Sequence, residues 1–223
     1  MSRGAPRGVL VLFAKQPVAG QVKTRLCPPL SPESAARLYE AMLLDIADQR
    51  AGGADVDLAV CFTPTHARPW FARHLPADYA LTAQRGASLG ERMRAAFEAF
   101  ASAGYERIAL RGTDSPTLPD ARIREVFSAL DEADLVLCPD LDGGYNMIAL
   151  REPQAELFAI EMSTGSVLEQ TRARAAALGL RSVELEPHHD VDRWRDLALL
   201  DAKSDGLDRA PRTRRWLTEK SPY

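Results

Sequence analysis

The most constraining feature of the chain is an apolar run at residues 8–14 that passes directly into a basic loop at residues 15–26. The run contains no polar residue, which predicts a strand buried on both faces. The loop combines cations, a hydroxyl and a glycine that lets backbone amides approach a ligand: Lys15, Gly20, Lys23, Thr24 and Arg25. Because ligands gather at the carboxyl ends of strands in parallel sheets, we expect this loop to hold nucleotide phosphates. A solvated basic loop is the alternative.

Short apolar segments alternate with amphipathic ones along the rest of the chain. The predicted strands are residues 8–14, 56–62, 79–82, 107–111, 134–138, 145–150 and 180–185. The predicted helices are residues 31–51 (with Ser31 as N-cap, ended by Gly52 and Gly53), 66–74, 88–104, 119–130, 166–178 and 193–203. This alternation predicts an α/β fold, a single three-layer α/β/α domain around a mostly parallel sheet.

We place the boundary of this domain at residues 1–205. Residues 206–223 are rich in arginine and are predicted to be a loosely attached basic C-terminal tail. The cationic residues of this tail are Arg209, Arg212, Arg214 and Arg215.

Composition narrows the functional classes. The net charge of −3 argues against general affinity for nucleic acid or for an anionic membrane. The N-terminus lacks the apolar segment of a signal peptide, and no apolar stretch reaches the length of a membrane span, so we expect a cytoplasmic protein. Cys27, Cys61 and Cys138 are widely spaced, which favours free thiols over a metal site. The oligomeric state stays open, with a homodimer among the allowed states.

Three acidic segments follow predicted strands or precede a predicted helix. Asp114 lies in a turn at residues 112–116, Asp142 precedes two glycines, and Asp190 and Asp192 lie ahead of the last predicted helix. Carboxylates and phosphates can share a site when Mg²⁺ or Mn²⁺ lies between them. We therefore expect Asp114 and Asp192 to bind such an ion, with Asp190 as the alternate ligand. Helix capping and turn formation are the alternative roles for each aspartate.

Several catalytic signatures are missing from the sequence. It contains neither a Gly-x-Ser-x-Gly elbow, nor a Gly-x-Gly-x-x-Gly fingerprint, nor a Walker loop. These absences argue against nucleophilic serine catalysis, a dehydrogenase and a P-loop kinase.

Six ordered motifs together carry a family resemblance. They lie at residues 13–26, 84–93, 112–116, 142–145, 163–171 and 190–192. In this arrangement the chain resembles the small bacterial glycosyltransferase-A-type proteins of arsenosugar biosynthesis and the radical-SAM/selenodomain-associated transferases, within the nucleotide-diphospho-sugar transferase superfamily. The layout is also similar to phospholactate guanylyltransferases and molybdenum-cofactor nucleotidyltransferases.

The resemblance implies a glycosyltransferase-A fold and a role for individual positions. It implies that Lys15, Lys23 and Arg25 bind phosphate and that Asp114, Asp190 and Asp192 bind the metal. It also implies that Gln84 and Gly86 lie near the nucleobase or ribose. Many members carry Trp where this chain has Met162.

Three functions are compatible with these patterns. The first is metal-dependent transfer of a sugar from a nucleotide sugar to a small acceptor, in which Lys23 and Arg25 stabilise the diphosphate leaving group. Asp142 then acts as general base or as a hydrogen-bond partner of the acceptor. The alternative is nucleotidyl transfer from an NTP to a phosphorylated small molecule, with release of pyrophosphate. The third is a non-catalytic nucleotide-binding subunit. The sequence does not identify the base, the sugar or the acceptor.

Overall fold

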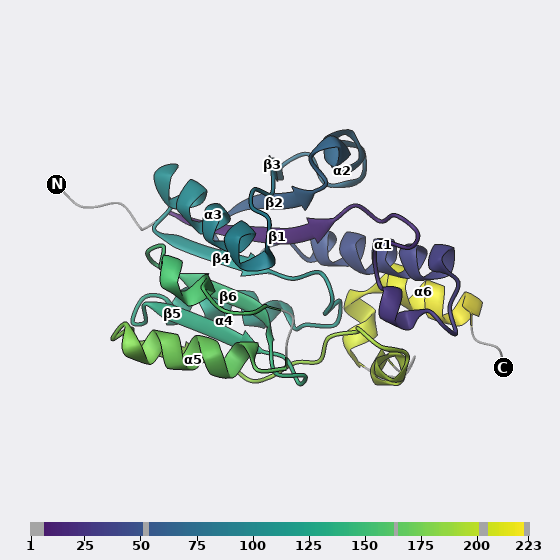
Figure 1. The fold of residues 1–223 in the computed structure, drawn as a ribbon. Helices are drawn as coiled ribbons and strands as arrows, with labels where there is room; N and C mark the ends of the chain where they lie inside the picture. Colours follow the sequence, from purple (N-terminus) through teal and green to yellow (C-terminus); the bar gives the residue numbers. More distant parts are fainter. Residues whose placement is uncertain (1–6, 51–53, 163–164, 201–204, 221–223) are drawn as a thin grey trace.

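The computed structural model describes residues 7–50, 54–162, 165–200 and 205–220. A seven-stranded sheet lies at the centre, in the order β3-β2-β1-β4-β6-β5-β7 (Figure 1). Its strands are β1 (Gly8–Lys15), β2 (Asp57–Thr63), β3 (Ala80–Ala83), β4 (Arg107–Arg111), β5 (Leu135–Pro139), β6 (Tyr145–Leu150) and β7 (Ser182–Glu184). Only β6 runs antiparallel to its neighbours β4 and β5. The mostly parallel α/β sheet is therefore confirmed.

Helices connect the strands and cover both faces of the sheet. They are α1 (Pro32–Gln49), α2 (Arg68–His74), α3 (Leu89–Ser102), α4 (Asp120–Ala129), α5 (Val167–Ala177) and α6 (Pro211–Lys220). Short 3₁₀ helices are η1 (Thr24–Leu26), η2 (Thr65–Ala67), η3 (Ala155–Phe158), η4 (Trp194–Leu200) and η5 (Asp205–Arg209). Ser31 caps α1 as expected, because its Oγ accepts the Ser34 N–H at 3.2 Å. The helix ends at Gln49, and the predicted stop at residues 52–53 lies outside the described residues.

The strands separate two apolar layers. In β1, Leu10 and Leu12 face the core that contains α1 and α4. Val9 and Val11 face the opposite core, which α3 and α5 cover. This alternation follows from the two-residue period of a strand, so an all-apolar strand is buried on both sides. The three-layer architecture expected from the sequence is present.

The C-terminal segment differs from the prediction made for residues 206–223. Instead of a loosely attached tail, η5 and α6 pack on α1, with Leu207, Ala210 and Trp216 buried beside Leu38 and Met42. Because this segment is rich in arginine, its composition did not reveal the apolar stripe on its inner face. The helix predicted at residues 193–203 is the 3₁₀ helix η4 as far as Leu200, and its remaining residues lie outside the described part.

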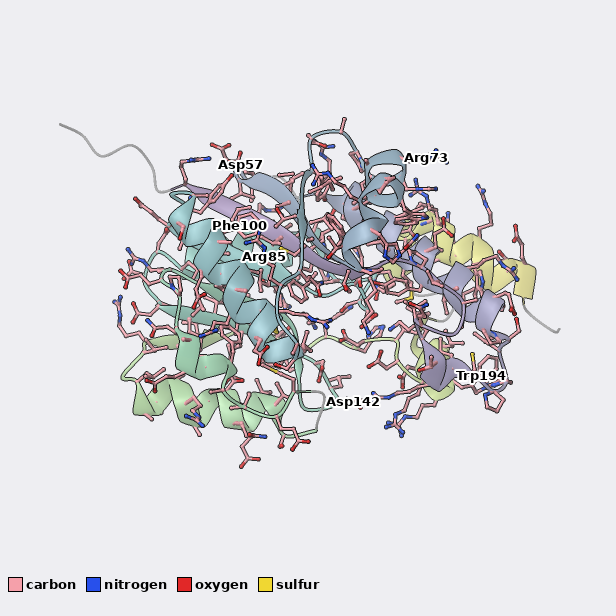
Figure 2. The ribbon with its side chains drawn as sticks, turned by 45° about the horizontal axis from the view of Figure 1, so that its top comes forward. Asp57, Arg73, Arg85, Phe100, Asp142 and Trp194 are labelled. Carbon is pink, nitrogen blue, oxygen red and sulfur yellow. The ribbon has the colours of Figure 1, made fainter. Side chains whose placement is uncertain are left out.

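The order of the strands determines where a ligand can bind. From β1 the chain goes outward to β2 and β3, and it returns to β4 on the other side of β1. Loops after β1 and β4 therefore diverge and leave a crevice at the carboxyl end of the sheet. Asp142 lies at this end, whereas Asp57 lies at the amino end of β2 (Figure 2). Within the described residues, none of the helices combines the length and apolar content that a membrane crossing demands.

Candidate active site

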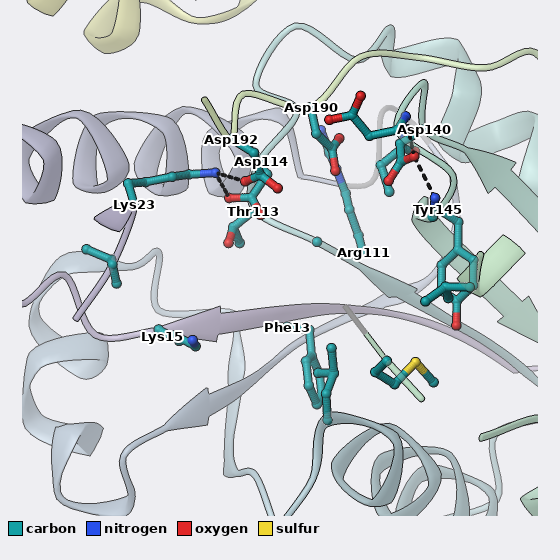
Figure 3. Close-up of a pocket in the computed structure, with 18 of the residues that line it drawn as sticks. Phe13, Lys15, Lys23, Arg111, Thr113, Asp114, Asp140, Tyr145, Asp190 and Asp192 are labelled. Carbon is teal, nitrogen blue, oxygen red and sulfur yellow. Dashed lines mark hydrogen bonds and ion pairs between the residues drawn. The ribbon is translucent and has the colours of Figure 1, made fainter. Parts of the chain in front are cut away.

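A cavity of about 780 Å³ opens at the carboxyl ends of β1 and β4 (Figure 3). Basic side chains of the loop after β1 lie on one side, and acidic side chains of three other loops face them. The lining residues on these two sides include Lys15, Lys23, Thr24, Arg25, Asp114, Asp140, Asp142, Asp190 and Asp192. Apolar side chains also line the cavity, among them Phe13, Met93, Ile148 and Met162. The basic loop and the predicted acidic segments therefore share one cavity. We call Asp114, Asp140, Asp190 and Asp192 the cavity acids.

Lys23 bridges two of the cavity acids. Its Nζ lies 2.5 Å from Asp114 Oδ1 and 2.8 Å from Asp192 Oδ1, and it donates to the Val191 carbonyl oxygen at 2.5 Å. The Lys23 side chain is only 4% exposed. Burial lowers the pKa of Lys23, but the adjacent charges of Asp114 and Asp192 outweigh burial and raise it. The same contact reverses the effect of burial on Asp192 and lowers its pKa.

The loop that presents Lys23 is anchored on both sides. Val22 and Leu26 are buried in two different apolar clusters. Between them, Lys23 takes the left-handed conformation, with φ of 48° and ψ of 36°. That conformation is uncommon for a non-glycine residue and tends to occur where surrounding structure enforces it. The loop thus positions the ammonium through its buried neighbours.

Asp190 is a buried member of the cavity acids and lies beside Asp114. Its Oδ1 accepts a hydrogen bond from Ser115 Oγ. Burial and the negative charge of Asp114 raise the pKa of Asp190 to about 8. The main chain joins the two acidic segments, because Val191 N–H donates to Asp114 O at 2.9 Å. Asp190 and Asp114 are therefore held together although their charges repel.

Two polar residues brace the loop after β4, and the sequence analysis missed both. Arg111, at the end of β4, is 1% exposed and donates to Gln49 Oε1 at 2.6 Å. Gln49 in turn donates to the Pro116 carbonyl oxygen at 2.5 Å. Burial lowers the pKa of Arg111 to about 10, so the guanidinium stays charged at neutral pH. The available signal was an arginine at the carboxyl end of a strand whose three central residues are apolar.

Other missed residues tie the loops of the cavity together. Tyr39 OH accepts the Lys15 N–H at 3.0 Å and shares a 2.9 Å hydrogen bond with Thr113 Oγ1. Asn146 is buried and donates through Nδ2 to the carbonyl oxygens of Pro139 and His188, at 3.3 and 3.2 Å. Apart from the bond between Asn146 and Pro139, these contacts join segments far apart in the sequence, so local patterns could not reveal them.

Asp140 organises the loop that carries Asp142. Its Oδ1 accepts the backbone N–H groups of Asp142 and Gly144 at 2.9 and 2.7 Å. Burial raises the pKa of Asp140. Asp142, which we predicted to be a general base, is 57% exposed and lies 3.7 Å from Arg195 NH2. The structure places Asp142 at the cavity, and its catalytic role stays a prediction.

The predicted nucleotide-binding residues divide into two groups. Lys15, Thr24, Arg25 and Gln84 line the cavity together with Lys23. Gln84 Nε2 donates to the carbonyl oxygens of Cys61 and Ala14 at 2.9 and 3.3 Å, which fixes the amide at the ends of β1 and β2.

The two glycines predicted to contact the nucleotide are not among the described residues that line the cavity. Gly20 has φ of 76° and bends the basic loop. Gly86 has φ of 127°, and a Cβ there would lie 2.9 Å from the Arg92 backbone nitrogen. Both positions need a backbone conformation that side chains disfavour, and a contact of either glycine with nucleotide stays a prediction.

The cavity acids fit a divalent ion by chemistry but are not arranged as a finished metal site. Among the described residues, no group of three or more histidine, cysteine, aspartate or glutamate side chains is placed to hold a metal ion. Lys23 lies between the two predicted principal ligands, Asp114 and Asp192. Carboxylate oxygens from separate loops are nevertheless the donors that Mg²⁺ and Mn²⁺ take. Burial and the charge of Asp114 raise the pKa of Asp190, so within this cluster the charged form of Asp190 is disfavoured.

Comparison with protein families gives a match over more than half of the chain. Residues 46–164 match the model of a family described as "Uncharacterized protein conserved in bacteria (DUF2064)". This span includes β2 to β6 and two of the three acidic segments.

Relatives of established name are guanylyltransferases. The chain is 28% identical to 2-phospho-L-lactate guanylyltransferase of Halorubrum lacusprofundi, over 88% of this chain and 87% of the relative. It is 27% identical to phosphoenolpyruvate guanylyltransferase of Sphaerobacter thermophilus, over 78% of this chain and 84% of the relative.

A similar solved structure comes from Desulfovibrio desulfuricans G20 and is described as a proposed nucleotide-diphospho-sugar transferase. It has a TM-score of 0.88 and 29% identity, and the match covers 95% of this chain and 94% of that one. A nucleotidyl transferase from Methanothermobacter shares the fold, with a TM-score of 0.59 and 15% identity, over 88% of this chain and 96% of that one. The fold predicted from the sequence is therefore confirmed.

These relatives support the assignment of the chain to the superfamily of nucleotidyltransferases and nucleotide-diphospho-sugar transferases. The chain is therefore a transferase. They do not extend to the arsenosugar group that the motifs resemble. They also favour the nucleotidyl alternative over the glycosyl transfer that the sequence analysis placed first.

Proposed function

The chain belongs to the DUF2064 family, and we propose that it is a nucleotidyltransferase that couples an NTP to a phosphorylated small molecule. One observation carries the proposal: the basic loop after β1 and the cavity acids line a single cavity, with Lys23 Nζ 2.5 Å from Asp114 Oδ1. The names of the guanylyltransferase relatives add support and suggest GTP as the first nucleotide to test.

In the proposed reaction, a phosphate oxygen of the acceptor attacks the α-phosphorus of the NTP. The bond between the α-phosphorus and the oxygen that bridges to the β-phosphate breaks, and pyrophosphate leaves. A phosphate monoester carries a charge of about −1.5 to −2 at neutral pH, so the nucleophile needs little help from a base. This chemistry does not require Asp142 as a general base, a role that belongs to the glycosyl alternative.

The residues of the basic loop supply the charges that such a transfer needs. Lys15, Thr24 and Arg25 line the side of the cavity where the triphosphate would lie. Arg25 NH1 is 3.9 Å from Asp192 Oδ2, so it can turn toward a phosphate at little cost. Cations held close to the β- and γ-phosphates stabilise the charge that develops on leaving pyrophosphate. Transfer then depends on positioning and electrostatics more than on proton transfer.

We propose that Asp114 and Asp192, with Asp190, hold Mg²⁺ or Mn²⁺ when nucleotide is bound. Such an ion would neutralise phosphate oxygens of the nucleotide and of the leaving group. The burial of Asp190 beside the charge of Asp114, which raises the pKa of Asp190, is the feature of this chain that supports the assignment.

The acceptor would enter from the side of the Asp140–Asp142 loop. Arg193 and Arg195 line the cavity there, and the Arg195 side chain is 69% exposed. Guanidinium groups suit acceptors that carry a phosphate and a carboxylate, as 2-phospho-L-lactate and phosphoenolpyruvate do.

Parallel product assays test the proposal. Each NTP is incubated with Mg²⁺ and with 2-phospho-L-lactate or phosphoenolpyruvate, and pyrophosphate is measured; nucleotide sugars are assayed separately for NDP release. We expect pyrophosphate that depends on both NTP and acceptor, and its loss in Asp114→Asn. NDP release from a nucleotide sugar, without pyrophosphate from any NTP, would contradict nucleotidyl transfer.

Glycosyl transfer remains the second candidate because of the Desulfovibrio structure and its description. In that reaction Asp142 would activate the acceptor hydroxyl. An Asp142→Asn substitution separates the candidates, since it should reduce glycosyl transfer strongly and nucleotidyl transfer only slightly.

A further inference from the structure

The ammonium of Lys23 has the surroundings of a bound cation. Two carboxylate oxygens, from Asp114 and Asp192, and the Val191 carbonyl oxygen lie within 2.8 Å of Nζ. Oxygen donors of this kind, at about 2.1 Å from Mg²⁺, form the sites of hard divalent ions. In Figure 3 the Lys23 side chain points from its loop toward Asp114 and Asp192, which belong to two other loops. The same oxygens therefore bind the lysine ammonium here and would bind a metal ion.

A dication and this ammonium cannot occupy the position together. Both would lie within about 3 Å of the same two carboxylates, and like charges at such a separation repel strongly in a partly buried site. One of the two must leave. The backbone at residue 23 is held by the buried side chains of Val22 and Leu26, so the lysine side chain is the part that can rotate away.

We propose that Lys23 is a built-in counterion that occupies the metal position of the free protein and leaves it when nucleotide binds. The nucleotide part of this inference rests on the proposed function. The phosphates of an incoming NTP give the ammonium a new anionic partner, and its departure exposes Asp114 and Asp192 to the ion. Metal and nucleotide then promote each other's binding, since coupling between two ligands is reciprocal.

The proposal predicts weak metal binding in the free protein. With Lys23 in place, two carboxylates carry a net charge of about −1 together with the ammonium, against −2 without it. Removing the ammonium should therefore tighten metal binding, although it would weaken phosphate binding. An ordinary phosphate-binding lysine would not have this opposite pair of effects.

Metal binding without nucleotide tests the first part of the proposal, which is that Lys23 occupies the metal position of the free protein. Free Mn²⁺ is measured by electron paramagnetic resonance during titration of the full chain, for wild type, Lys23→Met and Lys15→Met. Lys15 is the matched control, because it lines the same cavity and its removal changes the net charge equally. We expect Lys23→Met to lower the Mn²⁺ dissociation constant about tenfold, and Lys15→Met to change it by less than about twofold. Equal or weaker Mn²⁺ binding by Lys23→Met would overturn the proposal.

Two further variants make the result interpretable. Lys23→Gln serves the same comparison if Lys23→Met lowers the melting temperature too far for titration. The double variant Lys23→Met/Asp114→Asn should lose the gain in Mn²⁺ affinity. A gain that survives in the double variant would mean that the ion binds elsewhere, and it would also overturn the proposal.

Binding of preformed Mn²⁺–GTP tests the second part of the proposal, which is that nucleotide and metal promote each other's binding. We expect wild type to bind this complex at least about tenfold more tightly than Mn²⁺ alone, with a clearly smaller ratio in Lys23→Met. Equal ratios in the two proteins would refute the coupling. If no Mn²⁺–NTP complex binds to either protein, the proposed function fails, whereas the measurement with Mn²⁺ alone still decides whether Lys23 occupies the metal position.

Discussion

Two carboxylate clusters connect the first third of the chain to its last third, and they differ in how fully their charge is satisfied. In the joint between α1 and α6, the Asp45 side chain is completely buried. It accepts hydrogen bonds from the Thr213 N–H and hydroxyl, both at 2.8 Å, and from the Arg212 N–H and guanidinium at 3.1 and 3.3 Å. Every donor comes from the first turn of α6, so the carboxylate also lies at the positive end of that helix.

The charge of the cavity acids, by contrast, is less fully satisfied. Asp114 and Asp192 share the ammonium of Lys23, and the pKa of Asp190 is raised to about 8 by burial and by the charge of Asp114. A carboxylate whose donors are all supplied by the fold contributes to stability. Carboxylates held beside one another with too little positive charge lower stability and favour cation binding instead. The comparison separates an acid whose donors the fold supplies from acids that, in our proposal, bind a cation.

The largest expected effect concerns the joint. Asp45→Asn should lower the free energy of unfolding by about 3 kcal/mol, because an amide cannot accept all of these donors and Arg212 loses the buried one of its two charge partners. Urea denaturation measures the change. Asp48→Asn is the matched control, since Asp48 contacts the same Arg212 at 2.5 Å but is 52% exposed, and it should cost less than about 1 kcal/mol. Similar losses for both variants would remove the contrast between buried and exposed acids.

Asp114→Asn should reduce Mg²⁺-dependent pyrophosphate release about 100-fold, which corresponds to about 2.7 kcal/mol. The reason is the loss of a carboxylate that, in our proposal, binds the ion. Unlike Asp45→Asn, this variant should change the urea midpoint only slightly. Full Mg²⁺-stimulated turnover in Asp114→Asn would contradict the assignment.

Asp190→Asn should change the free energy of unfolding in the opposite direction from Asp45→Asn. In metal-free protein at pH 8, we expect it to raise the free energy of unfolding by an amount on the order of 1 kcal/mol, because the substitution removes a charge that its surroundings disfavour. Its Oδ1 can still accept from Ser115. Urea denaturation in EDTA checks the sign, and a loss comparable to that of Asp45→Asn would place Asp190 among the structural acids.

The smallest effect is a pH dependence. Because the folded-state pKa of Asp190 is raised to about 8 from its ordinary value of 3.8, the folded protein binds more protons than the unfolded chain between these values. The contribution of Asp190 to the stability of the metal-free protein should therefore be most favourable at the acidic end of this window and become less favourable as pH rises toward 8. Asp190→Asn should flatten the decline relative to wild type. Parallel pH profiles for the two proteins would indicate that another group is responsible.

The sequence predicted those parts of the molecule that depend on local patterns. The apolar run before Lys15 and the turn around Asp114 could be assigned to strand ends, because strand period and turn residues are local signals. Their meeting at one cavity followed from the rule for parallel sheets. The pairing of Asp45 with Thr213 could not be predicted, since 168 residues separate the two positions. Asp45 did leave one trace, as an acid on the apolar stripe of α1 that includes Leu38 and Met42.

Other errors came from treating residue types separately. The four arginines after residue 205 suggested a solvated tail, whereas Leu207 and Trp216 bury the inner side of that segment against α1. Lys23 was assigned to phosphate and Asp114 to metal, and their direct contact at 2.5 Å was not foreseen. Opposite charges in neighbouring loops will pair when no ligand separates them, and only the folded geometry shows which ones are close enough.

The most direct test of the account is ³¹P nuclear magnetic resonance of a reaction that contains the full chain, Mg²⁺, GTP and 2-phospho-L-lactate or phosphoenolpyruvate. The account predicts inorganic pyrophosphate and, in equal amount, a new pair of coupled resonances from a phosphoanhydride that joins the nucleotide to the acceptor. Both signals should be absent with Asp114→Asn. If no NTP yields pyrophosphate with these acceptors while a nucleotide sugar is consumed to NDP, the cavity carries out glycosyl transfer and the account is contradicted.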